Sequence, residues 1–161
     1  MFRFKIQLFK IKGFNFIFLE DLKLMKIGKK ILVMGLPGSG KTTLAKILVK
    51  ELNASWLNAD EVRKKYNDWD FSEAGRQRQA KRMFDLAEEF ISQGKNVVAD
   101  FICPTKKTRN EFRPDKIIWM DTIIKGRFDD TNKIFEKPDN YDFRVTVKDA
   151  INESKKILKE I

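Results

Sequence analysis

The sequence contains no histidine and a single cysteine, Cys103, among its 161 residues. Without imidazole, a catalytic proton has to be moved by a carboxylate, a lysine, a tyrosine or the thiol. One cysteine excludes an intramolecular disulfide and a zinc site built from several thiolates. The chain also lacks a signal peptide and an apolar run of transmembrane length, so we expect a cytoplasmic protein without a membrane partner.

Acidic residues are fewer than basic ones, with 23 Asp and Glu against 33 Lys and Arg, giving a net charge of +10. This charge suits polyanionic partners such as nucleic acid, an anionic membrane surface or small nucleotides that carry several phosphates. A solvated, lysine-rich surface is the alternative explanation. No aromatic–basic repeat or recognition helix is present, so nucleic acid is not the expected partner.

The length suits one compact domain, preceded by a segment of different character. Residues 1–24 alternate apolar and polar side chains on both sides of Gly13, a pattern that predicts a small hairpin with one apolar face. The alternative, which we prefer, is that translation begins at Met25. The predicted organisation is therefore an N-terminal extension over 1–24 and a main domain over 25–161.

Strands alternate with helices from Lys30 onward. Apolar runs predict strands within the segments 30–35, 55–60, 96–102 and 116–122. Helical spacing predicts a helix after the first strand, a long helix from the cap Ser72 to Gly94, and a last helix that starts at Thr146 and buries Ile151 and Ile157. Residues 123–142 are predicted to be a mobile loop. The alternation predicts a three-layer α/β fold with a mainly parallel sheet and active residues at the carboxyl ends of its strands.

The segment "GLPGSGKTT", residues 35–43, fits the phosphate-binding pattern GxxxxGK[ST]. It lies between a predicted buried strand and an amphipathic helix, where backbone N–H groups and the helix N-terminus can cradle a phosphate. Lys41 would neutralise the β- and γ-phosphates, and Thr42 would bind Mg²⁺. We therefore expect ATP and Mg²⁺ as cofactors, with these nucleotide-binding residues: Gly35, Pro37, Gly38, Ser39, Gly40, Lys41, Thr42 and Thr43.

Two aspartates end predicted strands where a phosphoryl group would be transferred. Asp60 ends the second strand, expected beside the P-loop strand, and is a candidate to orient an acceptor hydroxyl and take its proton, or to hold a magnesium-bound water. Capping the next helix is its alternative role. Asp100 ends the following strand and is a candidate second metal-side carboxylate, with a role in the turn as the alternative.

An acceptor site is indicated by basic and aromatic residues after Asp60. A basic stretch suited to an anionic acceptor is formed by Arg63, Arg76, Arg78, Lys81 and Arg82, although a solvated helix face gives the same pattern. Phe71 and Phe135 lie in polar surroundings, where they either stack on a base or pack into the core. Nothing near Cys103 in sequence lowers its pKa, so we interpret it as a packing or backbone-positioned residue and not a nucleophile.

Across residues 28–145 the sequence resembles the adenylylsulfate kinase family, whose pattern reads GLSGSGKST, LDGDNVR, GFSxxDRxxNxRR, FISP, VDTP and KxFTGID. The corresponding segments here are "GLPGSGKTT", "LNADEVR" (57–63), "DFSEAGRQRQAKR" (70–82), "FICP" (101–104), "MDT" (120–122) and "KIFEKPD" (133–139). The resemblance implies a P-loop kinase that uses ATP and magnesium to phosphorylate the ribose 3′-hydroxyl of adenylylsulfate. It also implies a homodimer, to which no residue pattern here points.

Position by position, the resemblance implies that Lys41 and Asp60 are catalytic, and that Arg63 and Arg76 grip anionic groups of the acceptor. It places the acceptor's base between the rings of Phe71 and Phe135, and Lys133 in the closing lid. It adds Gln79, Ile102 and Cys103 to the residues that bind the acceptor.

The departures from the family pattern fall on the acceptor side. Aspartate is replaced by Asn58, serine by Cys103, and asparagine by both Glu61 and Gln79, while residues 136–138 differ in a shortened lid. Such changes favour an altered acceptor, and cytidine diphosphoramidate kinase, which phosphorylates the 3′-hydroxyl of a cytidine nucleotide in capsule phosphoramidate synthesis, is the alternative within the resemblance. A kinase acting on polynucleotide ends or another hydroxyl, and a module that holds ATP without turnover, are further alternatives.

Overall fold

The computed structural model describes residues 8–11, 14–17 and 28–161. In the first part, β1 (Leu8–Ile11) pairs antiparallel with β2 (Phe14–Ile17), with Ile11 opposite Phe14. The proposed boundary between residues 24 and 25 lies outside the described residues, as do the outer ends of the predicted hairpin.

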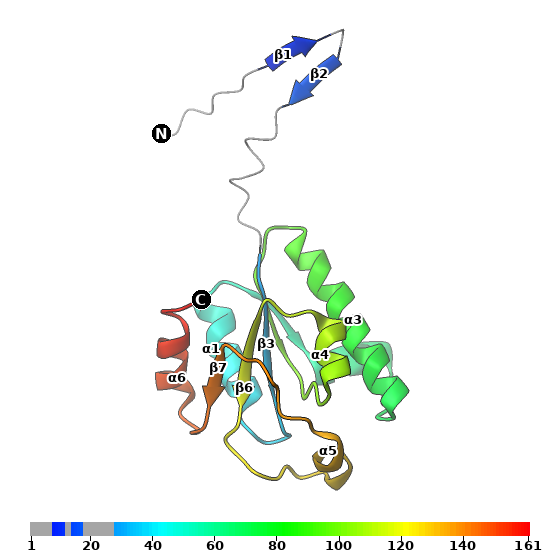
Figure 1. Ribbon diagram of the computed structural model, residues 1–161, viewed down its shortest axis with the longest axis vertical. Coiled ribbons are helices and arrows are strands. Elements are labelled where there is room, and N and C mark those ends of the chain that lie inside the picture. Colours follow the sequence, from blue (N-terminus) through cyan, green and yellow to red (C-terminus); the bar gives the residue numbers. More distant parts are fainter. Residues whose placement is uncertain (1–7, 12–13, 18–27) are drawn as a thin grey trace.

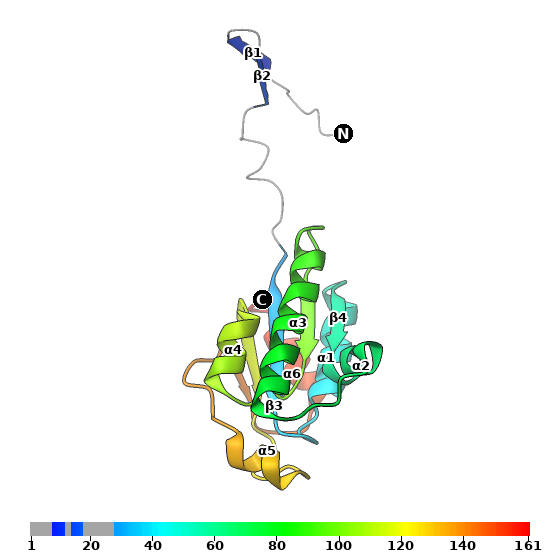
Figure 2. The same ribbon diagram turned by 90° about the vertical axis from the view of Figure 1, so that its right-hand side faces the viewer.

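The main sheet contains five parallel strands in the order β4-β5-β3-β6-β7 (Figures 1 and 2). They are β3 (Lys30–Gly35), β4 (Ser55–Asn58), β5 (Val97–Asp100), β6 (Lys116–Met120) and β7 (Phe143–Val145). The expectation that the second predicted strand lies beside the P-loop strand is wrong, because β5 takes that place and β4 forms the edge. Strand β7 was not predicted, since three residues are too few to show a period of two.

Six helices follow or separate the strands of this sheet. They are α1 (Lys41–Glu51), α2 (Ala59–Tyr66), α3 (Glu73–Ile91), α4 (Lys106–Phe112), α5 (Asp129–Ile134) and α6 (Ala150–Ile157). Helices α1 and α6 cover one face of the sheet, and α3 and α4 cover the other (Figure 1). The predicted three-layer α/β fold is confirmed.

The core lies on both faces of β3, whose successive side chains point in opposite directions. Ile31 and Val33 join the cluster under α1 and α6, while Leu32 and Met34 join the cluster under α3 and α4. All four side chains are fully buried. A continuous apolar strand is therefore what the position of β3 requires, since helices cover it on both sides.

Side-chain caps fix where several helices begin. Ser72 accepts a hydrogen bond from the backbone of Gly75 and starts α3, as predicted. Helix α4 was not predicted; it begins with a capping box in which Thr105 and Thr108 exchange side-chain and backbone hydrogen bonds.

The C-terminal third differs from the expectation in three respects. The predicted loop 123–142 contains α5, whose six residues are too few to show a helical period. The last helix begins at Ala150, because the side chain of Asp149, and not that of Thr146, accepts from the backbone of Asn152. Ile151 is 62% exposed, so the prediction that it is buried was wrong, whereas Ile157 is 1% exposed.

Within the described ranges, none of the helices combines the length and the apolar character that crossing a bilayer requires.

Candidate active site

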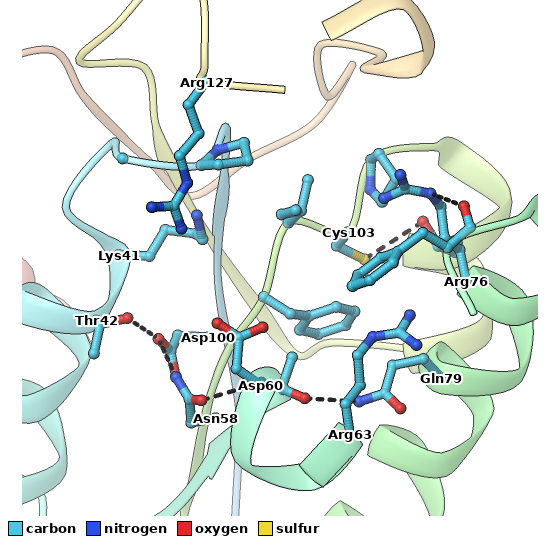
Figure 3. A pocket seen from close by; sticks show the side chains of 18 residues that line it. Lys41, Thr42, Asn58, Asp60, Arg63, Arg76, Gln79, Asp100, Cys103 and Arg127 are labelled. Carbon is cyan, nitrogen blue, oxygen red and sulfur yellow. Dashed lines mark hydrogen bonds between the residues drawn. The ribbon is translucent and has the colours of Figure 1, made fainter. Parts of the chain in front are cut away.

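A cavity of about 180 Å³ opens beside the carboxyl ends of β3, β4 and β5. It brings together most of the residues predicted for the site: Pro37, Gly38, Lys41, Thr42, Asp60, Arg63, Phe71, Arg76, Gln79, Asp100, Ile102 and Cys103. In Figure 3, Lys41 and Thr42 lie on one side, Arg63 and Gln79 lie on the other, and the carboxylate of Asp60 points into the space between them. The predicted residues outside its lining are Gly35, Ser39, Gly40, Thr43, Lys133 and Phe135.

The P-loop closes tightly onto the sheet at its first glycine. Gly35 has a φ of +146°, and a Cβ there would lie 2.5 Å from the carbonyl oxygen of Met120, so only glycine fits. The loop ends at Gly40, which starts α1 without a side-chain cap. The N–H groups of the first turn of α1 therefore have no side-chain acceptor and are available to an anion.

Lys41 is folded back onto the loop that carries it. Its Nζ donates to the carbonyl oxygen of Leu36 at 2.9 Å. Burial lowers the pKa of Lys41 to about 8, the nearby charges of Asp100 and Asp60 oppose this, and the positive charge of Arg127 adds to it. Figure 3 shows the guanidinium of Arg127 beside the amine of Lys41. Arg127 was missed in the sequence because it stands in the predicted loop, where only its charge marks it.

Asp100 is the centre of a hydrogen-bonded cluster and is 2% exposed. Its carboxylate accepts from Thr42 Oγ1 at 2.6 Å, from Trp56 Nε1 at 2.7 Å, and from Asn58 Nδ2 at 3.0 and 3.1 Å. Burial raises the pKa of Asp100, and the hydrogen bonds from these three side chains act in the opposite direction. Trp56 was missed, although its spacing of two from Asn58 puts both side chains on one face of a strand.

Asp60 lies in the first turn of α2 and not at the end of β4. The alternative role as a helix cap belongs to Asn58, whose Oδ1 accepts from the backbone N–H groups of Asp60 and Glu61, both at 3.1 Å. No hydrogen bond from the described residues engages the carboxylate of Asp60. This side chain is therefore free to meet a ligand in the cavity.

Arg63 and Arg76 hold the segment between α2 and α3 with part of their donor groups. Arg63 Nη1 donates to the carbonyl oxygens of Asp68 and Asp70 at 2.9 and 3.0 Å, and Arg76 Nε donates to that of Phe71 at 2.8 Å. Both guanidinium groups also approach the Phe71 ring, at 4.6 and 5.7 Å from its centre. A guanidinium has five N–H donors, so each arginine keeps some for an anion.

Two predicted acceptor-side residues hold the scaffold together. Gln79 donates to the carbonyl oxygen of Ala59 at 3.2 Å and accepts from Arg82 at 2.7 Å, which ties α3 to α2. Cys103 is 1% exposed, and burial raises the pKa of its thiol to about 12. The thiol is therefore protonated at neutral pH and is not a nucleophile.

Lys133 and Phe135 line a second cavity, of about 480 Å³, between α3, α4 and α5. The backbone N–H of Glu136 donates to the carbonyl oxygen of Pro104 at 2.8 Å, and this hydrogen bond ties the segment to the start of α4. Phe135 also packs against the apolar cluster under α3 and α4. The structure therefore does not bring Phe71 and Phe135 together across one cavity, as a sandwiched base would require.

The parallel five-stranded sheet and the glycine loop between β3 and α1 define a P-loop kinase fold. Residues 31–114 match the AAA domain family, and the chain belongs to that family.

The sequence is similar to those of curated adenylyl-sulfate kinases. Over 111 residues the chain is 32% identical to the adenylyl-sulfate kinase of Bacillus velezensis, which covers 65% of this chain and 51% of the relative. Over 89 residues it is 37% identical to the adenylyl-sulfate kinase of Bacillus licheniformis, covering 52% and 45% of the two chains. The chain thus spans about half the length of the curated relatives it matches.

The fold is also that of solved kinases. The APS kinase CysC of Mycobacterium tuberculosis, solved in complex with AMPPNP and APS, matches with a TM-score of 0.73 and 22% identity over 82% of this chain and 96% of that one. At this level of identity the likeness concerns the fold.

Proposed function

We propose that the protein transfers the γ-phosphoryl group of ATP to the ribose 3′-hydroxyl of a small nucleotide, with adenylylsulfate as the acceptor. The observation that carries the proposal is a single cavity in which Lys41 and Thr42 of the P-loop face Asp60 and Arg63. The named relatives, which are adenylyl-sulfate kinases, support the choice of acceptor.

On the donor side, the uncapped first turn of α1 and Lys41 would bind the β- and γ-phosphates of ATP. Arg127, beside Lys41, supplies further positive charge where the transferred group carries negative charge.

The residues present fit a magnesium ion that arrives with the nucleotide. Thr42 offers a hydroxyl oxygen 2.6 Å from the carboxylate of Asp100, and oxygen ligands of this kind are those Mg²⁺ prefers. Thr42 would hold the ion, with Asp100 and, through water, Asp60 on its protein side. Bound there, magnesium would neutralise phosphate charge and orient the phosphates.

On the acceptor side, Asp60 would accept the proton of the 3′-hydroxyl while the oxygen of that hydroxyl attacks the γ-phosphorus. A new oxygen–phosphorus bond forms, the bond between the γ-phosphorus and the β–γ bridging oxygen breaks, and ADP leaves. Positioning and charge stabilisation provide most of the catalysis in such reactions.

A cytidine diphosphoramidate is the second candidate acceptor, because Gln79 and Cys103 depart from the family pattern and both line the cavity. Each also has a structural partner, Ala59 for Gln79 and Thr108 for Cys103. These contacts explain the two residues without a changed acceptor, and this favours adenylylsulfate.

The test is ADP release from Mg-ATP with adenylylsulfate, cytidine diphosphoramidate or a short oligonucleotide in parallel reactions. We expect release that depends on adenylylsulfate and is lost in Lys41→Ala and Asp60→Ala. The matched controls are Lys50→Ala, at the far end of α1, and Lys64→Ala, on the exposed side of α2 and outside the cavity lining; both should stay active. The proposal would be contradicted if none of the three acceptors stimulated the release of ADP, or if Asp60→Ala released ADP as fast as the wild type.

A further inference from the structure

We propose that Asn58 and Trp56 are positioning residues that hold the metal-side carboxylate Asp100, and that the amide and the carboxylate are exchangeable between positions 58 and 100. The inference rests on the proposed function, because it assigns Asp100 to the magnesium side of that site.

The two positions are direct neighbours across the sheet. In the parallel pairing of β4 with β5, Asn58 is the register partner of Asp100. Asn58 Nδ2 lies 3.1 Å from one carboxylate oxygen of Asp100 and 3.0 Å from the other. A carboxylate moved from one position to the other would therefore stay at the same edge of the cavity.

The orientation of the Asn58 amide is fixed from both ends. Its Oδ1 accepts from the backbone of Asp60 and Glu61 at the start of α2, so its Nδ2 has to face Asp100. An amide can donate to a carboxylate and accept from a helix start at once, whereas a carboxylate can only accept. Asn58 thereby couples the place of Asp100 to the start of the helix that carries Asp60.

Trp56 supports Asp100 from β4, the strand that also carries Asn58. Its indole is at the edge of the sheet and 37% exposed, yet its Nε1 points inward and donates to Asp100 at 2.7 Å. Thr42, the third donor to Asp100, belongs to α1. The carboxylate is thus held by β4 from one side and contacts the P-loop helix on the other.

Asn58 and Asp100 carry complementary groups, an amide that donates and a carboxylate that accepts. With carboxylates at both positions, two negative charges would lie at hydrogen-bond distance without a donor between them. With amides at both, the edge would have no carboxylate. Only the two mixed combinations keep one charge and one donor.

The experiment measures the dissociation constant of ADP by calorimetry, with Mg²⁺ and with EDTA, and compares the ratio between variants. Asn58→Asp and Asp100→Asn should each reduce the magnesium-dependent gain in affinity by about 10- to 100-fold, the usual effect of losing a group that supports a metal site. The double variant Asn58→Asp/Asp100→Asn should recover most of that gain. The matched control is Asn152→Asp on α6, where an exposed asparagine donates to Asp149 at 2.7 Å outside the cavity; it should behave as wild type.

Trp56→Phe gives a second test, which does not depend on whether the double variant folds. It should reduce the magnesium-dependent gain on the order of tenfold. The indole emission of the wild type should change with Mg-ADP, and that change should be absent in Trp56→Phe; circular dichroism checks the fold of each variant.

The outcomes separate the two proposals. A wild type that binds ADP equally with Mg²⁺ and with EDTA would overturn the magnesium assignment of Asp100 and with it this inference, whereas the proposed function is contradicted only by the absence of acceptor-dependent ADP release. Two results would overturn this inference alone, given a wild type whose affinity for ADP depends on Mg²⁺. One is a folded double variant whose magnesium-dependent gain is no larger than that of the single variants. The other is a Trp56→Phe variant whose gain equals that of the wild type.

Discussion

Arg76 on α3 is tied to Asp130 on α5 by an ion pair of 3.0 Å. The arginine is 8% exposed and lines the candidate active site, whereas the side chain of Asp130 is 66% exposed. Thr131 of α5 also accepts from the same guanidinium nitrogen, at 3.2 Å. Helix α5 is therefore fastened to a residue that would bind the acceptor, and Asp130 competes with an acceptor anion for one of the two terminal nitrogens of that guanidinium.

Removing this competitor should strengthen acceptor binding. We expect Asp130→Asn to lower the acceptor KM about 1.4-fold to fivefold, since ion pairs with an exposed partner contribute about 0.2–1 kcal/mol. Steady-state kinetics with saturating Mg-ATP measure it. Asp129→Asn is the matched control, because Asp129 pairs with Lys125 on the surface. An unchanged or raised acceptor KM in Asp130→Asn would contradict the competition.

Nucleotide binding should depend on the protonation of Lys41, whose pKa burial lowers to about 8 in the ligand-free protein. The ammonium form binds phosphate, so the affinity for ADP should fall as the pH rises through 8 toward 10. Titrations of wild type and Lys41→Arg from pH 7.5 measure it, because arginine stays charged over this range. Parallel profiles for the two proteins would rule out Lys41 as the cause.

The lowered pKa of Lys41 should also affect the stability of the ligand-free protein. The pKa of Lys41 falls from 10.5 to about 8 on folding, so burying its charge costs stability below pH 8, and this cost shrinks as the pH rises toward 10.5. Lys41→Met should raise the free energy of unfolding on the order of 1 kcal/mol at pH 7, with a smaller gain at pH 10. Urea denaturation measures both. A variant less stable than wild type at pH 7 would count against the buried charge.

The thiol of Cys103 should resist alkylation in the folded protein. It is 1% exposed with its pKa raised to about 12, so both access and thiolate are lacking at pH 8. Mass spectrometry after iodoacetamide should show unmodified native protein and complete modification in guanidinium. Stoichiometric labelling of the native protein would show that this part of the site opens.

The P-loop, the layers and the position of most site residues follow from local sequence, because strand and helix periods and the GxxxxGK[ST] spacing are local. The strand order does not. The sequence alone does not tell which of β4 and β5 lies beside β3, and so it hides that Asn58 faces Asp100. The helix α5 and Arg127 were also out of reach, since six residues show no period and a charge in a loop shows no direction.

The most direct test of the proposed reaction is to identify the oxygen atom that becomes phosphorylated. The protein is incubated with Mg-ATP and either adenylylsulfate or its 3′-deoxy analogue, and the products are identified by mass spectrometry and phosphorus NMR. We expect one added phosphoryl group on the 3′-oxygen of adenylylsulfate, and we expect the 3′-deoxy analogue to compete for binding without causing release of ADP. Phosphorylation at another position, or acceptor-dependent ADP release with the 3′-deoxy analogue, would contradict the proposed reaction.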